Sequence, residues 1–343
     1  MNFQNSKYTL RFADASDNEG IREIFESESF HGNIDVKFLR GSHPYESFLA
    51  DGEDVKILVI IDNENKKTAA VGGAVIRREY INGTDEKCAY LTGLKVHPKY
   101  RKKIFLIAKA YEFLHQSVLD CAFSYTTILD SNEMAIRLFE KKHKNLPEYK
   151  YLGHYTTYCF HGGKRKIKLE RDNLKGFDKL LKEHFSKQNL VPCDCNYKGF
   201  GEKTFYCVRE NNEIIACCYV GNQQAHKQYK MCSYGGIYHI LSHVPTQLFG
   251  YPKFPSKDSM INHGVISYLY VKNNDKKLCA DFLRSVAAES NYDLFIWGGF
   301  ENNPLSKALD AMKTVRYGSR LYSVVWDKEV ELSGIIGMEA ALL

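Results

Sequence analysis

The sequence has 343 residues, of which 44% are hydrophobic and 26% are charged, and a formal net charge of +6 at pH 7. This composition is that of a globular protein, and the length favours two domains that each bury a core. A nucleic-acid-binding surface usually carries a larger basic excess, and no apolar run is long enough to span a bilayer. We therefore expect neither nucleic acid nor a membrane as a partner.

The cellular context follows from the N-terminal region and the cysteines. The N-terminal region is mixed and charged, without the apolar core of a signal peptide, which predicts a cytoplasmic protein. The ten cysteines are spread along the chain, which favours reduced thiols. Neither Cys193-Asp-Cys195 nor Cys217-Cys218 has the spacing of a zinc site, so no metal is expected.

In chain order, a strand is predicted over residues 8–13, followed by a helix that Asp17 caps. Residues 30–52 contain glycines and a proline that break long elements, which predicts short helices and loops. Two β-prone runs, 56–62 and 68–78, flank a turn-prone tetrad and predict a hairpin.

The most regular part of the first half follows this hairpin. Residues 89–96 are apolar and β-prone, and His97-Pro98 ends the strand because proline donates no hydrogen bond. Apolar side chains then recur every three or four positions, which predicts an amphipathic helix; they are Ile104, Ile107, Tyr111, Leu114 and Val118. Residues 124–129 predict a second strand, and Asp130-Ser-Asn-Glu133 has capping-box spacing before another helix.

The turn before the amphipathic helix is strongly basic. Lys99-Tyr-Arg-Lys-Lys103 places four cations in five residues at the helix start. Free backbone amides, the helix dipole and basic side chains together form an anion site suited to a pyrophosphate. The alternative is a solvated helix start with no ligand.

Two motifs in this region resemble those of the GNAT acyltransferase superfamily. The run from Val96 to Arg101 is similar to its acetyl-CoA signature, and Asn132 to Phe139 is similar to its fourth-helix motif. The resemblance implies acetyl-CoA, or another acyl-CoA, as cosubstrate. It also implies a set of cofactor-binding residues, which are Leu94, Lys95, Val96, Arg101, Lys102, Lys103, Ile104, Phe105, Leu106, Asn132, Ala135 and Phe139.

The sequence departs from the family pattern at three of these positions. Ile104 and Leu106 stand where the family has glycine, which allows a backbone to approach phosphate closely. Phe139 stands where the family often has a tyrosine that protonates the departing thiolate, and a phenyl ring has no proton to give.

The second half repeats the order of elements. A basic, glycine-containing segment, 161–168, leads to a helix after Asn173, a hairpin, an aromatic insertion over 223–261, and a strand over 265–271. The turn after this strand, Lys272 to Lys277, lacks the proline, arginine and glycines of the motif. We expect a second GNAT-like domain that does not bind CoA.

The predicted fold is therefore mixed α/β, with two tandem GNAT-like domains, 1–161 and 162–343, each a central mixed twisted sheet flanked by helices. The tandem arrangement resembles N-myristoyltransferases, Eis-type acetyltransferases and Fem-type peptidyl transferases. The first half is also similar to Hookless-type acetyltransferases and to uncharacterised bacterial relatives. The implied activity is transfer of an acetyl or other acyl group from CoA to a primary amine of a small molecule or peptide. The alternative is an inactive acyl-CoA sensor or scaffold.

The catalytic groups are harder to find, because no side-chain base is visible on the strand over 89–96. In the tandem relatives that the chain resembles, the C-terminal carboxylate acts as the general base, so the resemblance implies the carboxylate of Leu343. The alternative is that residues 335–343 add an edge strand to the second domain. Tyr125 is a candidate proton donor, with aromatic packing as the alternative reading.

Overall fold

The computed structural model describes residues 3–4, 7–27, 33–101, 103–161, 164–310 and 312–343. The first half forms β1 (Phe3–Gln4), β2 (Tyr8–Phe12), α1 (Asn18–Glu26), β3 (Ile34–Leu39), α2 (Pro44–Leu49), β4 (Asp54–Asp62), β5 (Lys67–Ile81), β6 (Thr84–Val96), α3 (Ile104–His115), β7 (Phe123–Leu129), α4 (Glu133–Phe139) and β8 (Glu148–Phe160). The second half forms β9 (Glu170–Arg171), α5 (Phe177–Glu183), β10 (Glu202–Glu210), β11 (Glu213–Asn222), β12 (Gln228–Tyr234), α6 (Ile237–Leu241), β13 (His263–Val271), α7 (Lys276–Ala288), β14 (Leu294–Phe300), α8 (Ser306–Leu309), β15 (Val315–Val325) and the 3₁₀ turn η7 (Ala340–Leu342).

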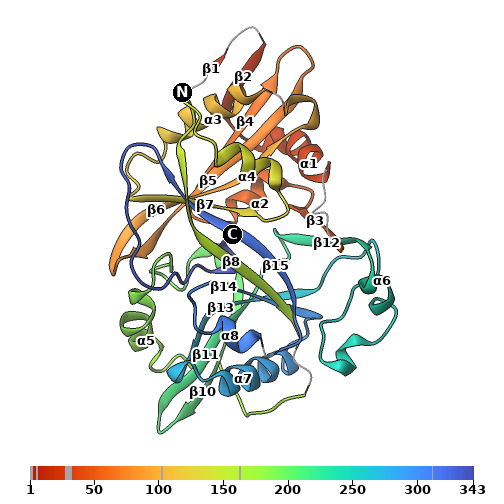
Figure 1. The fold of residues 1–343 in the computed structure, drawn as a ribbon, viewed down its shortest axis with the longest axis vertical. Helices are drawn as coiled ribbons and strands as arrows, with labels where there is room; N and C mark the ends of the chain where they lie inside the picture. The colour runs from red at the N-terminus through yellow and green to blue at the C-terminus, as the bar shows by residue number, and fades with distance from the viewer. Residues whose placement is uncertain (1–2, 5–6, 28–32, 102, 162–163, 311) are drawn as a thin grey trace.

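One large sheet runs through both halves of the molecule. Its thirteen strands lie in the order β1-β2-β4-β5-β6-β7-β15-β8-β14-β13-β11-β10-β9. Helices α1 to α4 lie with the first half, whereas α5, α7 and α8 lie with the second (Figure 1). The mixed α/β class predicted from the sequence is confirmed. None of the helices in the described ranges is long and apolar enough to cross a membrane.

Most of the first-half elements match the predictions. The hairpin β4–β5 turns at the expected tetrad, where Lys66 has a φ of 54°. β6 begins earlier than expected because Asn82 and Gly83, with φ values of 50° and 84°, make a tight turn that joins it to β5. The prediction of only short helices and loops for 30–52 was wrong, since β3 pairs antiparallel with β12 from the insertion.

The two halves exchange their last strands. β15, from the end of the chain, lies between β7 and β8 and pairs antiparallel with both. β8 in turn pairs antiparallel with β14 of the second half. β8 therefore adjoins β15 and β14 and does not touch β7 in the sheet order.

Each half contains a pair of parallel strands that part after three residues. β6 pairs with β7 up to Tyr90–Tyr125, and β13 pairs with β14 up to Val265–Ile296. Three residues after the last pair, each strand has a β-bulge, at Gly93 with a φ of 69° and at Tyr268 with a φ of 50°. This equivalence in register relates the two halves residue by residue.

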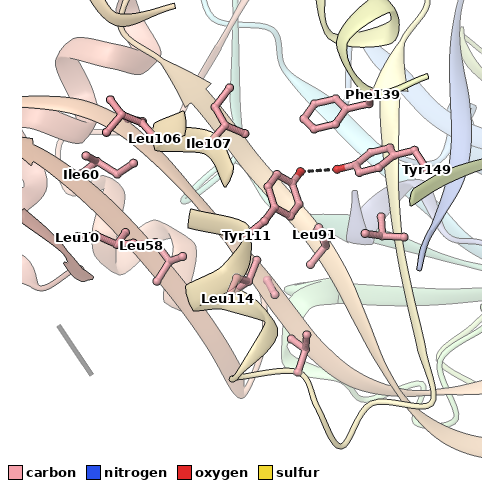
Figure 2. Close-up of a cluster of buried hydrophobic side chains, with 14 of the residues drawn as sticks. Leu10, Leu58, Ile60, Leu91, Leu106, Ile107, Tyr111, Leu114, Phe139 and Tyr149 are labelled. Carbon is pink, nitrogen blue, oxygen red and sulfur yellow. Dashed lines mark hydrogen bonds between the residues drawn. The ribbon is translucent and has the colours of Figure 1, made fainter. Parts of the chain in front are cut away.

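A hydrophobic core lies between α3 and the first half of the sheet. Figure 2 shows Leu106, Ile107 and Leu114 of α3 facing side chains of β2, β4 and β6. At the end of this core, the hydroxyls of Tyr111 and Tyr149 share a hydrogen bond, as the dashed line marks. Each fully buried aliphatic side chain contributes about 1.5–3 kcal/mol, so this core fixes α3 against β6.

Candidate functional site

The molecule contains a cavity of about 1410 Å³ whose walls come from both halves. This exceeds the usual volume of a site for a drug-sized molecule, roughly 300–1,000 Å³. The first half contributes β6, the start of α3 and the loop before α4, whereas the second contributes β12, β13 and the chain end. Of the residues predicted to bind the cofactor or catalyse, those that line the cavity are Leu94, Lys95, Val96, Arg101, Ile104, Asn132, Ala135, Phe139 and Leu343.

The parting of β6 and β7 opens this cavity. Beyond Tyr90, β6 keeps β5 as a partner on one side while its other edge leaves β7. Gly93 has a φ of 69°, a conformation that favours glycine, and a Cβ there would lie 2.9 Å from the ring of Phe48. The open edge of β6 therefore presents backbone groups to the cavity.

At the start of α3, only part of the basic turn faces the cavity. Arg101 and Ile104 line it, and the amides of Ile104 and Phe105 have no hydrogen bond to a described residue. Lys103 points elsewhere, because its Nζ is hydrogen-bonded to the Tyr8 hydroxyl and lies 5.3 Å from the Tyr100 ring centroid. Lys102 lies outside the described residues.

Two further motif positions lie away from the cavity. Phe105 is 53% exposed and its ring meets Tyr8 edge-on, whereas Leu106 is buried in the core at 3% exposure. Of the two residues that replace family glycines, Ile104 borders the cavity and Leu106 does not. The departure at Ile104 thus lies at the cavity wall, and the departure at Leu106 lies in the core.

Helix α4 is capped by Asn132 and not by Asp130, the residue that the capping-box spacing had indicated. The Asn132 side chain accepts a hydrogen bond from the Ala135 amide at 3.2 Å. Phe139 stacks on Tyr149 with ring centroids 4.3 Å apart, beside the Tyr111 hydroxyl (Figure 2). Burial raises the pKa of Tyr111 and of Tyr149, so both hydroxyls stay protonated at neutral pH.

The side chain of Lys95 extends from β6 towards α1. Its Nζ lies 4.7 Å from the ring centroid of Phe25, and it shares the cavity wall with Lys37. Burial, with a smaller effect from Lys37, lowers the pKa of Lys95 to about 8. Lys95, one of the predicted cofactor-binding residues, therefore brings its side chain to the part of the cavity wall near Lys37 and α1.

The end of the chain reaches the cavity. Residues 335–343 form no strand and instead end in η7, so the alternative of an edge strand is wrong. Leu343 lines the cavity, and its carbonyl oxygen accepts a hydrogen bond from Lys227 Nζ at 3.0 Å. The side-chain amide of Gln223 donates to the backbone oxygen of Ala341 at 2.7 Å, which holds the last residues of the chain beside the cavity.

Lys227 belongs to a buried charge cluster that the sequence did not reveal. Its Nζ lies 3.4 Å from Asp51, and Asp51 lies 2.7 Å from Arg40. All three side chains are at most 6% exposed. Arg40 precedes α2, Asp51 follows it and Lys227 lies in the insertion, so no spacing in the sequence could have indicated the cluster.

Tyr125 does not line the cavity. It is fully buried, accepts from Arg77 Nη2 at 2.5 Å and donates to Glu79 Oε1 at 2.8 Å. Burial raises the pKa of its hydroxyl well above 10, and the neighbouring glutamate adds to the increase. The expected role as proton donor is corrected: Tyr125 supports a buried ion pair whose Arg77 also reaches the oxygen of Leu342 at 3.4 Å.

Solved structures share this architecture. Saccharomyces cerevisiae N-myristoyltransferase, solved with bound myristoyl-CoA, matches with a TM-score of 0.60 at 13% identity over 95% of this chain and 81% of that one. The chain has the tandem GNAT fold. A GCN5-related N-acetyltransferase from Sphaerobacter thermophilus matches with a TM-score of 0.55 at 11% identity, covering 96% of this chain and 99% of that one. One from Anabaena variabilis matches with a TM-score of 0.52 at 12% identity, covering 92% and 72%.

At these identities the likeness to other GNAT folds concerns the backbone and not the chemistry. No protein-family model matches the sequence. No curated protein matches it either. Among the described residues, no group of three or more His, Cys, Asp or Glu side chains is arranged to hold a metal ion.

Proposed function

We propose that the chain is an N-acyltransferase that moves an acetyl or longer acyl group from CoA to a primary amine of a small molecule or peptide. The observation that carries this proposal is the meeting of three features at one cavity. They are the open edge of β6, the start of α3 and the chain end at Leu343. In this scheme residues 1–161 form the catalytic repeat and residues 162–343 the second repeat.

The first half supplies a binding path for an acyl-CoA. The backbone from Leu94 to Val96 pairs with the pantetheine arm. Arg101 and the amides of Ile104 and Phe105 hold the pyrophosphate, because a helix start offers free N–H groups to an anion. The bulge at Gly93 directs an amide towards the thioester carbonyl, where it stabilises the negative charge that develops on oxygen.

The reaction is a direct attack on the thioester. The amine nitrogen forms a bond to the carbonyl carbon, the carbon–sulfur bond breaks, and the amine proton passes to the terminal carboxylate of Leu343. The thiolate leaves and takes a proton from solvent, since Phe139 has none to give. Lys227 holds the carboxylate in place through the contact at 3.0 Å.

The test begins with calorimetric titration of acetyl-CoA and longer acyl-CoAs, followed by thiol release with a panel of primary amines. Adding a short glycine extension after Leu343 displaces the carboxylate without altering any side chain. We expect acyl-CoA affinity to stay within twofold and turnover to fall at least a hundredfold, the usual scale for a lost general base. An extended chain that turns over normally would contradict the assignment of the base.

A second function, an acyl-CoA sensor without turnover, is favoured by two departures from the family pattern. Ile104, at a family glycine position, narrows the proposed pyrophosphate site, and Phe139 removes the usual acid. Saturable acyl-CoA binding, with no thiol release above the uncatalysed rate for any amine in the panel, would support the sensor over the enzyme.

A further inference from the structure

In the second half, β13 and β14 also part, and the end of the chain fills the gap between them. Past the last pair, Val265–Ile296, η7 packs against both β13 and β14. Tyr268, at the bulge of β13, is 0% exposed, and its hydroxyl donates to the oxygen of Pro192 at 2.8 Å. The position equivalent to the proposed thioester pocket is therefore occupied by protein, which supports the expectation that the second half binds no CoA.

The backbone amide at the bulge of the second half already has a hydrogen-bond acceptor. The N–H of Tyr268 donates to Oε1 of Glu339 at 2.8 Å, and Glu339 is 7% exposed. The equivalent residue of the first half is Gly93, which lines the cavity. In the second half, the amide at the bulge thus binds a carboxyl oxygen of Glu339. In the proposed reaction of the first half, the amide at the equivalent bulge binds the carbonyl oxygen of the thioester.

We propose that Glu339 is a positioning residue that uses the bulge amide of Tyr268 as an anchor and thereby holds Leu343 in the cavity of the first half. The inference rests on the proposed acyl transfer, because the position of Leu343 matters for catalysis only if its carboxylate is the base. The second repeat then serves as the support for the chain end.

The path from the anchor to the cavity is short and hydrogen-bonded. Glu339 immediately precedes η7, and its backbone oxygen accepts from the Leu342 amide at 3.0 Å. On the preceding side, Tyr155 donates to the oxygen of Met338 at 3.1 Å. Because this single turn separates Glu339 from Leu343, a displacement of the glutamate side chain shifts the terminal carboxylate.

The surroundings of Glu339 keep its carboxyl group neutral. The titratable groups near it are the hydroxyls of Tyr155 and Tyr268 and the thiol of Cys218, and no cation faces it among the described residues. Burial raises the pKa of Glu339 to about 8, and the hydrogen bond from the Tyr268 amide lowers it only in part. A glutamine at this position therefore reproduces the neutral side chain and keeps an oxygen for the amide.

The experiment compares E339A, E339Q and a control, E331A, in which an exposed glutamate of the same segment is removed. Hydrogen exchange of residues 335–343 is measured in each, together with kcat and KM. We expect E339A to exchange about tenfold faster, as loss of a buried hydrogen bond implies, with kcat reduced about tenfold and KM for acyl-CoA within twofold. E339Q and E331A should match the natural chain at pH 7.

Unchanged exchange in E339A, or a rise in KM without a fall in kcat, would overturn the anchor. Should E339A not fold, the natural chain and E339Q still decide the matter. Above pH 8, residues 335–343 of the natural chain should exchange faster than those of E339Q at the same pH, and equal rates would count against the proposal. If the natural chain has no turnover, the proposed function fails, while the exchange measurements still test the anchor.

Discussion

Removing the buried cation at the chain end tests the site most directly. Lys227 Nζ contacts the oxygens of Ala341 and Leu343, each at 3.0 Å, and Asp51 at 3.4 Å. In K227M the side chain keeps a similar length but gives no hydrogen bond and no charge. Breaking a buried ion pair from one side costs roughly 3–5 kcal/mol. Arg40 still contacts Asp51 at 2.7 Å, so we expect the lower end, about 3 kcal/mol.

Urea unfolding followed by circular dichroism measures this change, and thiol release measures its effect on turnover. The matched control is K253M, since Lys253 also lines the cavity but is 50% exposed and pairs with Asp293 at 3.1 Å. That variant should lose less than about 1 kcal/mol. We expect K227M to bind acetyl-CoA normally and to turn over more slowly. Stability of K227M equal to that of K253M would refute the reasoning, because it would mean that the buried cluster does not hold the chain end.

Three further outcomes are expected. R101A should weaken acetyl-CoA binding at least tenfold by calorimetry, because it removes a charge-assisted phosphate contact. K99A should leave the affinity unchanged, since the Nζ of Lys99 lies over the Tyr100 ring at 5.6 Å; equal effects of the two variants would place the pyrophosphate elsewhere. I104G should tighten acetyl-CoA binding, while L106G should leave affinity unchanged and lower unfolding free energy by about 4 kcal/mol; the reverse pattern would contradict the placement of these side chains. Because the pKa of Glu339 rises from 4.5 to about 8 on folding, the folded state holds a proton that the unfolded state releases, so stability should fall from about pH 5 to pH 8. E339Q should flatten this fall, and parallel stability curves for the two chains would exclude the buried carboxyl as its cause.

The local sequence pattern correctly predicted those elements whose structure depends on residues close in sequence. The stripe from Ile107 to Leu114 predicted α3, and the turn-prone tetrad predicted the β4–β5 hairpin, because each depends on residues a few positions apart. The start of α4 was indicated for the same reason, although Asn132 caps it and not Asp130. Those short-range signals also indicated where one wall of the cavity lies.

What the sequence could not show depends on contacts between distant segments. β15 and β3 pair with strands far along the chain, and no local period identifies such a partner. Tyr125 was named as a candidate proton donor, but its hydroxyl points to Glu79 and Arg77 and away from the cavity. Lys227 and Asp51 become functional candidates only once folding brings them to Leu343.

The exchange of last strands has a consequence for synthesis of the protein. β7 has β15 as its antiparallel neighbour, so the first half keeps an open sheet edge until residues 315–325 leave the ribosome. Such an edge is prone to wrong pairing, and chaperones commonly bind chains at this stage. The segment that reaches the cavity is made later still. Under the proposed function, the N-terminal repeat therefore lacks its proposed base until residues 335–343 have been made.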